Sequence, residues 1–153
     1  HQCPGDRARL RGQRRAGRGG ARPHPHAAVF GPGGLVGHTA GEGGGVRVPM
    51  ASSKDTIALI GEPLCAKLGL QAGDKAFVMV NGCGATTMME MLVLFKDTVE
   101  FLNAKGVEVV GNMVGEILTV QEAAGFQLNI AKWDAETLEL WNTPCHTPAY
   151  SKV

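Results

Sequence analysis

The amino-acid sequence predicts an α/β domain, with a mixed sheet and flanking helices, preceded by a disordered arginine- and glycine-rich arm. Every arginine lies at or before Arg47 and every lysine lies at or after Lys54, so two different compositions meet near residue 46. Downstream of that point, apolar runs of strand length alternate with stretches of helical spacing. A glycine turn joins the first of these strands to the longest helix. We therefore expect a disordered segment over residues 1–45 and one partial α/β domain over residues 46–153.

Residues 1–45 carry seven arginines and thirteen glycines against two acidic residues, Asp6 and Glu42. A basic arm of this kind can bind nucleic-acid phosphates or an anionic membrane surface. This one has no amphipathic period and Phe30 as its only aromatic residue, so we expect no nucleic-acid partner. It also lacks Lys, Ile, Asn and Tyr, which is typical of GC-rich coding DNA translated out of frame. Out-of-frame translation and a genuine basic arm both stay open, and either would bury too little apolar surface to fold.

The remaining composition argues against a membrane or a secreted protein. No apolar run reaches the roughly 18 residues of a membrane-spanning helix, and no apolar region follows the basic start as in a signal peptide. The four cysteines, Cys3, Cys65, Cys83 and Cys145, are far apart. We therefore expect reduced thiols in a cytoplasmic protein, with no zinc site and no disulfide framework.

A helix is expected after Ser52 or Ser53, either of which can cap it. Its apolar residues follow helical spacing: Ile57, Ile60, Leu64 and Leu68. Pro63 interrupts the pattern because proline removes an N–H donor and clashes one turn back. The helix therefore kinks there, or a second short helix begins near Glu62. The turn at 73–74 then leads into an apolar run over 75–80, which predicts a strand buried on both faces.

A βαβ unit is predicted next. The turn 81–86 leads from the strand into a helix that opens with Thr87 and Glu90 at capping-box spacing and is expected to stop at Gly106. One stripe of this helix should be buried: Met88, Met91, Leu92, Phe95, Val99 and Leu102. The apolar segment 107–113 supplies a second strand, so the crossover should be right-handed.

The last predicted elements are a strand and a short helix. Apolar and polar residues alternate over 126–130, which predicts a strand with one wet face and suits a sheet edge. The apolar positions are Phe126, Leu128 and Ile130, and the polar ones are Gln127 and Asn129. Asp134 is expected to cap a helix that carries Leu138 and Trp141.

The turn Asn81-Gly82-Cys83-Gly84 is the most informative candidate for ligand binding. Glycine turns at helix N-termini can hold a phosphate with their N–H groups. This turn lacks the third glycine of the dinucleotide fingerprint and the Gly-Lys-Ser/Thr of the P-loop. We favour an architectural turn that uses glycine to reach positive φ.

Other reactive residue types have structural interpretations. Cys145 and His146 are sequence neighbours, so in an extended chain their side chains point to opposite sides and form no catalytic dyad. No spacing rule pairs Glu90, Glu116 and Glu122. The histidines of the arm, His24, His26 and His38, are expected to be solvated rather than metal ligands. The methionines Met88, Met89 and Met91 are expected to fill a core.

Several motifs recur in one order between residues 73 and 150. A buried strand leads into Asn81-Gly-Cys-Gly84 and a helix with an early Glu90. Val114-Gly115 is followed by Thr119 and by the run ending in Gly125-Phe126, then by Lys132-Trp-Asp134 and a close of Thr147-Pro-Ala-Tyr150. This order and spacing resemble the carboxy-terminal part of the substrate-binding module of dihydroxyacetone kinase (glycerone kinase).

The resemblance implies phosphoryl transfer to dihydroxyacetone, giving dihydroxyacetone phosphate in glycerol metabolism. In that family ATP and Mg²⁺ are held by a separate α-helical domain or subunit, or a phosphocarrier-dependent partner donates the phosphoryl group. The resemblance implies no cofactor in this chain itself, a nucleotide-binding kinase domain or subunit as partner, and is compatible with a homodimer.

The chain departs from the family at its substrate-binding histidine, which lies in Gly-Ile-His-Gly-Glu-Pro-Gly and forms a covalent hemiaminal with the substrate carbonyl. At that place stands Gly41-Glu-Gly-Gly-Gly45, while Ile60-Gly61-Glu62-Pro63 echoes the motif without the histidine. His38 does not align with it. We therefore carry over no catalytic, substrate-binding or metal-binding residue. The chain is expected to be an inactive fragment of a kinase, and the alternative is a non-catalytic binding or regulatory module.

Overall fold

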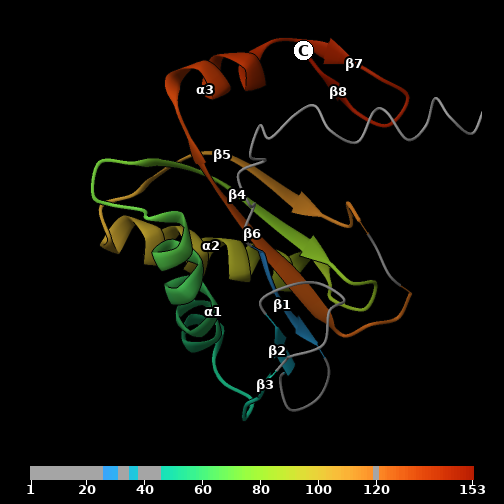
Figure 1. The fold of residues 1–153 in the computed structure, drawn as a ribbon. Coiled ribbons are helices and arrows are strands. Elements are labelled where there is room, and N and C mark those ends of the chain that lie inside the picture. The colour runs from blue at the N-terminus through green and yellow to red at the C-terminus, as the bar shows by residue number, and fades with distance from the viewer. Residues whose placement is uncertain (1–25, 31–34, 38–45, 119–120) are drawn as a thin grey trace, which may run out of the picture.

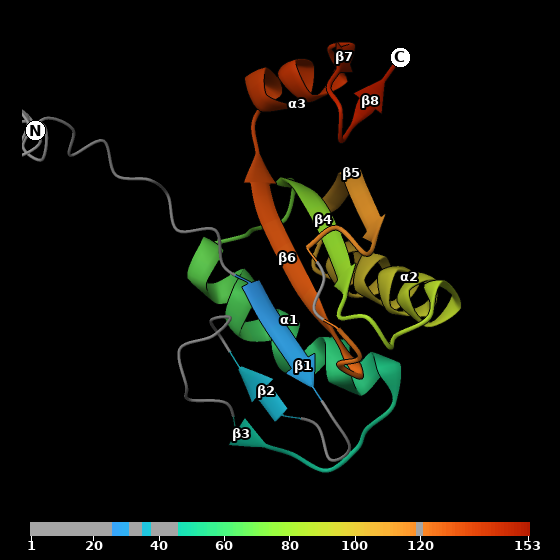
Figure 2. The same cartoon turned by 90° about the vertical axis from the view of Figure 1, so that its right-hand side faces the viewer.

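The computed structural model describes residues 26–30, 35–37, 46–118 and 121–153. Its elements are β1 (His26–Phe30), β2 (Leu35–Gly37), β3 (Val46–Arg47), α1 (Ser53–Leu68), β4 (Lys75–Gly82), α2 (Met88–Ala104), β5 (Glu108–Gly115), β6 (Gly125–Trp133), α3 (Ala135–Asn142), β7 (Cys145–His146) and β8 (Ser151–Lys152) (Figure 1). One mixed sheet has the order β3-β2-β1-β6-β4-β5, and β7 pairs with β8 beyond one end of it (Figure 2). The predicted mixed α/β class is confirmed.

The predicted βαβ unit is present, with β4 and β5 parallel and α2 between them in sequence. The prediction that the 126–130 strand lies at a sheet edge is wrong, because β6 pairs antiparallel with β4 on one side and with β1 on the other. Its alternation is real: Phe126, Leu128 and Ile130 are buried beneath the helices. The wet positions belong to the opposite face of the sheet, which periodicity alone cannot distinguish from an edge.

Two strands lie within the segment that the composition predicted to be disordered. β1 pairs with β6 from His26 opposite Asn129 to Phe30 opposite Gly125, and β2 pairs with β1. The structure therefore gives these residues strand pairing where the composition predicts disorder. Pairing uses main-chain groups, and β6 would otherwise present an unpaired row of them. The rest of residues 1–45, with His24 and His38, lies outside the described residues, and the boundary at residue 46 stays a prediction.

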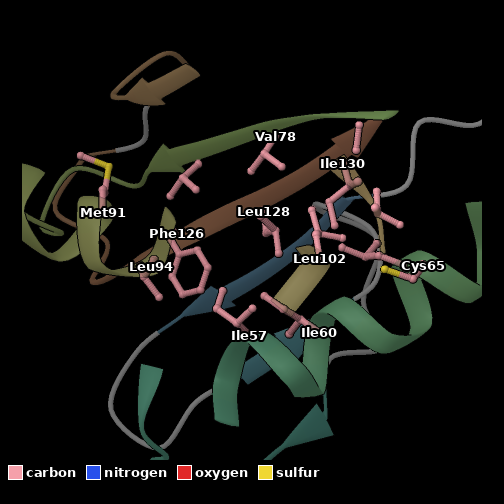
Figure 3. Packing of buried hydrophobic residues seen from close by; sticks show 14 residues of the cluster. Ile57, Ile60, Cys65, Val78, Met91, Leu94, Leu102, Phe126, Leu128 and Ile130 are labelled. Carbon is pink, nitrogen blue, oxygen red and sulfur yellow. The ribbon is translucent and has the colours of Figure 1, made fainter. Parts of the chain in front are cut away.

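The hydrophobic core lies between α1, α2 and one face of the sheet (Figure 3). Ile57 and Ile60 of α1 meet Leu128 and Ile130 of β6 there, and Leu102 comes from α2. These side chains are almost completely inaccessible to solvent. Burying each one stabilises the fold by about 1.5–3 kcal/mol before the entropy of ordering the chain is subtracted. The core therefore fixes both helices on one face of the sheet.

The prediction that the 75–80 strand is buried on both faces holds for one face. Ala76, Val78 and Val80 are fully buried, whereas Phe77 and the other residues that alternate with them are only partly buried. On that second face Phe77 stacks on Trp133 with ring centroids 4.7 Å apart, and Trp141 of α3 meets Phe77 edge-on at 5.0 Å. This aromatic cluster holds α3 at one end of the sheet.

The first helix is a single element that passes through Pro63 and has no separate second helix near Glu62. Ser52 is its N-cap and accepts from the Asp55 N–H, as expected, and Gly69 ends it with a left-handed φ of 61°. Pro63 is tolerated because the buried side of α1 is held by packing against the sheet and α2. Gly61 allows the close approach: a Cβ there would lie 2.6 Å from the Phe101 ring of α2.

The second helix has the predicted capping box, with Thr87 and Glu90 bonding each other's backbone, and ends at Ala104 shortly before Gly106. Its predicted stripe is partly wrong. Met91 and Leu102 are buried, but Met88 and Leu92 are about half exposed. Their places in the buried set are taken by Leu94 and two polar residues, Asp97 and Thr98. An apolar count cannot anticipate buried polar side chains such as Thr98, whose hydroxyl donates to the Leu94 carbonyl at 2.7 Å.

Candidate functional site at the carboxyl ends of β4 and β5

The turn that follows β4 lies beside the end of β5, because the two strands are parallel. Ligands of α/β sheets bind at this end of the strands. Asn81 is fully buried there. Its Oδ1 accepts from the N–H groups of Ile117 and Leu118 at 2.7 and 2.8 Å, and its Nδ2 donates to the Leu118 carbonyl at 2.6 Å. The same Nδ2 donates to Gln127 Oε1 at 3.1 Å. Asn81 therefore fixes the loop after β5 to the end of β4.

The N–H groups of the glycine turn are used within the chain. Those of Cys83 and Ala85 donate to the carbonyls of Gly125 and Ala123 at 3.1 and 3.3 Å. That of Gly84 donates to Glu116 Oε2 at 3.2 Å, and Gly84 has a φ of 97°. A phosphate would need these donors and would meet the Glu116 carboxylate. The geometry therefore supports the architectural interpretation of this turn.

Gly82 shows a constraint that sequence reasoning missed. A Cβ at this position would collide with the Glu116 carboxylate and would lie 2.9 Å from Met91 Sδ. The backbone of the turn and the Glu116 side chain therefore pack as one unit. The sequence signal for this contact is an Asn-Gly-x-Gly turn together with a glutamate that follows the next strand. The number of residues between the two parts depends on the fold, so a local motif does not reveal the contact.

Two buried thiols are poor nucleophiles: Cys83 at this end of the sheet and Cys65 near its opposite end. Burial raises the pKa of Cys83, and the nearby Glu116 carboxylate raises it further. Burial also raises the pKa of Cys65, although Lys105 opposes the shift. Because the thiolate is the reactive form, a raised pKa lowers reactivity at neutral pH. Both side chains are buried free cysteines that act as core residues.

A groove opens next to the turn, between the first turns of α1 and α2. It has a cavity volume of about 370 Å³ and Phe126 at its base. Its walls are mostly apolar and include Met50, Met89 and Val93. Ser53 belongs to its lining, and the Ser53 Oγ is buried without a hydrogen-bond partner among the described residues. The groove therefore has apolar walls, and a buried hydroxyl without a partner belongs to one of its lining residues.

The three glutamates occupy different structural places. Glu116 bonds the glycine turn, whereas the Glu90 carboxylate accepts from the Thr87 N–H at 2.8 Å and from its hydroxyl at 2.7 Å. These two bonds lower the pKa of Glu90. Glu122 adopts a positive φ of 54° in the loop before β6. The structure gives the first two carboxylates structural partners, and each belongs to a different turn or cap.

Cys145 and His146 form the short strand β7, where neighbouring side chains point to opposite sides. His146 Nδ1 lies 2.6 Å from Ser151 Oγ of β8 instead. Within the described ranges, no cluster of three or more His, Cys, Asp or Glu side chains could hold a metal ion. Among the helices of the described part of the chain, none is long and apolar enough to cross a membrane.

Comparison with curated proteins finds relatives that are named as kinase subunits. Over 111 residues the chain is 36% identical to the dihydroxyacetone-binding subunit of PTS-dependent dihydroxyacetone kinase 1 of Listeria innocua, an alignment that covers 72% of this chain and 34% of that protein. It is 35% identical over 83 residues to the corresponding subunit of the PEP-dependent dihydroxyacetone kinase of Escherichia coli, covering 54% of this chain and 23% of that protein. The chain therefore spans between a quarter and a third of their length.

Two solved structures share the fold. One, described as regulation of the dha operon of Lactococcus lactis, superposes with a TM-score of 0.70 at 24% identity and covers 78% of this chain and 38% of that one. The other, a dihydroxyacetone kinase operon co-activator, gives 0.69 at 22% identity and covers 78% and 43%. The Dak1 domain model matches residues 34–149, so the match begins upstream of the predicted boundary at residue 46. On this evidence the chain belongs to the Dak1 domain family.

Proposed function

We propose that this chain is the carboxy-terminal part of a dihydroxyacetone kinase substrate-binding module, which in an intact protein supports phosphoryl transfer to dihydroxyacetone. The observation that carries the proposal is the Dak1 match over residues 34–149, together with relatives named as dihydroxyacetone-binding subunits. The product is dihydroxyacetone phosphate, in cytoplasmic glycerol metabolism. A separate nucleotide-binding or phosphocarrier-dependent partner donates the phosphoryl group.

The part of the module found here supplies a rigid scaffold rather than the reacting groups. Asn81 and Glu116 tie the ends of β4 and β5 together, and the turn between β4 and α2 has its N–H groups satisfied internally. A scaffold of this kind can hold a substrate pocket in a fixed shape on the adjoining part of the module. It explains why so many of its polar groups bond one another.

This chain by itself is expected to be inactive. Residues 41–45 read Gly-Glu-Gly-Gly-Gly at the place of the family's histidine motif. Covalent capture of a small ketone needs a nucleophilic nitrogen held in place, and several cooperating groups cannot be replaced by one residue. We expect no stoichiometric adduct in intact-mass spectrometry after incubation with dihydroxyacetone, and no turnover in a coupled assay with an added phosphoryl donor and its subunit.

A chimera tests the positive side of the proposal. The matched third of the Listeria innocua subunit is replaced by residues 46–153 of this chain, so that the chimera keeps the relative's own upstream sequence. We expect a folded chimera that still forms the dihydroxyacetone adduct and supports phosphorylation with the relative's partner subunit. A chimera that folds, by circular dichroism, and yet gives no adduct would contradict the proposed function. The unmodified Listeria subunit is the control.

A second candidate is a non-catalytic binding or regulatory module, and the missing histidine motif favours it. Of the two solved structures that share the fold, one is described as regulation of an operon and the other as an operon co-activator. These descriptions apply to those two proteins. Calorimetric titration of the 153-residue chain with dihydroxyacetone separates the two candidates. Saturable binding without an adduct and without turnover would support the regulatory module, whereas no binding would favour the kinase fragment.

A further inference from the structure

An apolar surface covers the exposed side of the first two turns of α2. We define the methionine face by its residues: Met50, Met88, Met89, Leu92 and Val93. The solvent-exposed fractions of Met50 and Met89 are 78% and 71%, and the other three residues are about half exposed. Residues three and four apart on a helix are surface neighbours, so the four residues of α2 form two adjoining columns. Met50, Met89 and Val93 also line the groove beside α1.

The methionine face ends abruptly along α2. One helical turn beyond Val93, Lys96 pairs with Glu100 at 2.8 Å, and Lys54 of α1 reaches the same carboxylate at 3.1 Å. The outer side of α2 is thus apolar in its first half and charged in its second half. Scattered apolar residues on a surface need no explanation, but a contiguous patch with a charged border is typical of an interface. Methionine suits such a surface because its side chain adapts to a partner.

One residue that lines the groove has a buried hydroxyl without a hydrogen-bond partner in the described part of the chain. Ser53 Oγ is buried and lacks a partner among the described residues, although Ser52 beside it caps α1 and bonds Asp55. Because this Oγ is itself closed off from solvent, an occupant would fill the groove by apolar contact with Met50, Met89 and Val93.

We infer that the methionine face docks the portion of a Dak1-type subunit that lies outside the matched third. This inference rests on the proposed function. The alignments cover 23% and 34% of the two curated relatives, so most of each relative lies outside the matched part and is available to cover this face. The resemblance places that portion upstream, and Met50 lies at the upstream entry to α1. The occupant is therefore the remaining portion of a subunit of this kind, and it presents an apolar patch to the methionine face.

Methionine methyl groups report this contact directly. The chain has six methionines: Met50, Met79, Met88, Met89, Met91 and Met113. The full chain is labelled with ¹³C-methyl-methionine. A soluble nitroxide should broaden the methyl signals of the exposed residues Met50, Met88 and Met89 and spare the signal of buried Met91. The upstream portion of the Listeria innocua subunit, checked for folding by circular dichroism, is then added. We expect the three signals of the face to shift and to become protected, while Met79 and Met113 stay unchanged.

Matched variants make the test specific. Met89→Glu and Val93→Glu should each weaken the association by at least about tenfold, as expected when a charge is buried in an apolar interface. Leu140→Glu, at an exposed apolar position of α3, should leave it unchanged. Thermal unfolding of the free variants excludes a general loss of stability.

Three results would overturn the inference. Shifts confined to Met79 or Met113 would place the contact elsewhere. If the upstream portion of the Listeria innocua subunit neither binds this chain nor co-elutes with it after co-expression, that portion is not the occupant. Protection of the methionine face in the isolated chain that grows with its own concentration would assign the face to a second copy. None of the three readouts depends on dihydroxyacetone phosphorylation. The docking inference can therefore fail while the chimera is active, and it can hold while the chimera is inactive.

Discussion

Single buried polar residues decide the shape of the candidate site. Asn81 has no exposed surface and bonds three main-chain groups of the loop after β5. Glu116 bonds the turn after β4 from the opposite side. The two residues connect segments that are more than thirty positions apart in sequence, and each satisfies groups that would otherwise be buried without partners. The turn therefore depends on side chains that a local motif does not contain.

Replacing Asn81 tests this dependence. Asn81→Ala leaves the N–H groups of Ile117 and Leu118 without their acceptor, so we expect a loss of about 2–4 kcal/mol in the free energy of unfolding. Asn103→Ala, at an exposed position of α2, should cost little. Urea unfolding gives the energies, and amide hydrogen exchange should show faster exchange at Ile117 and Leu118 in the Asn81 variant alone. Equal stability of the two variants would mean that the loop does not need the clamp.

The Glu90 carboxylate makes stability depend on pH. The backbone N–H and the hydroxyl of Thr87 hold the pKa of Glu90 below its ordinary value of 4.5. A lowered pKa in the folded state stabilises the protein above the unfolded value and stops doing so as the pH falls through the folded value. The advantage of the wild type over Glu90→Gln should therefore shrink as the pH is lowered below 4.5.

Unfolding curves on both sides of that pH measure this difference. Thr87→Ala removes the hydroxyl donor and keeps the backbone one, so its own pH dependence should be weaker than that of the wild type. A constant difference between the wild type and Glu90→Gln at all pH values would contradict the prediction.

At the scale of elements, both long helices end in glycines with left-handed φ but in different surroundings. Gly69 follows α1 with a φ of 61° and would have open space around an added Cβ. Gly106 follows α2 with a φ of 76°, and a Cβ there would lie 2.8 Å from the Ala72 Cβ and 3.1 Å from its Cα. The Gly106 N–H also bonds the Asn103 carbonyl, and its own carbonyl accepts from Gly73. The end of α2 is thus packed against the turn before β4.

These two helix ends give a matched comparison. Gly69→Ala should destabilise the protein by roughly 1 kcal/mol, the cost of a left-handed φ for alanine. Gly106→Ala carries the same cost and a clash with backbone, so we expect about 2–3 kcal/mol. Chemical unfolding of both variants decides the order. Equal losses would show that the turn around Ala72 relaxes freely.

At the scale of the whole molecule, the sheet is completed by strands from a segment whose composition does not predict order. β6 is central because β1 covers its second edge, in a register that runs over all of β1. β2 and β3 extend the sheet further by antiparallel pairing. This arrangement protects an edge that could otherwise pair with another molecule.

Hydrogen exchange on the full chain tests the arrangement. If β1 pairs as the structure shows, amides within residues 26–30 should be protected, and removal of residues 1–33 should increase exchange on the β1 side of β6. The β4 side of β6 serves as the internal control because its pairing is untouched. Exchange at the random-coil rate throughout residues 26–30 would favour the disordered arm that the composition indicates.

The elements from α1 to α3 could be predicted in kind and order from the sequence, because each one carries its own local signal. Ser52, Thr87 and Asp134 cap their helices as expected, and the alternation over 126–130 is a strand. The family could be inferred as well, since motif order survives where overall identity is low. The boundary at residue 46 reflects composition, which does not determine whether a backbone segment can pair with a strand.

Only the tertiary structure decided where these elements lie and what the candidate site is made of. Strand periodicity shows that one face of β6 is buried, but its central position depends on β1 and β4, which are distant from it in sequence. The rotation of α2, which exposes Met88 and buries Asp97, follows from packing against α1 and the sheet. The clamp of Asn81 and Glu116 joins segments that are distant in sequence. Short-range patterns determine local structure, whereas contacts across the sheet depend on the complete fold.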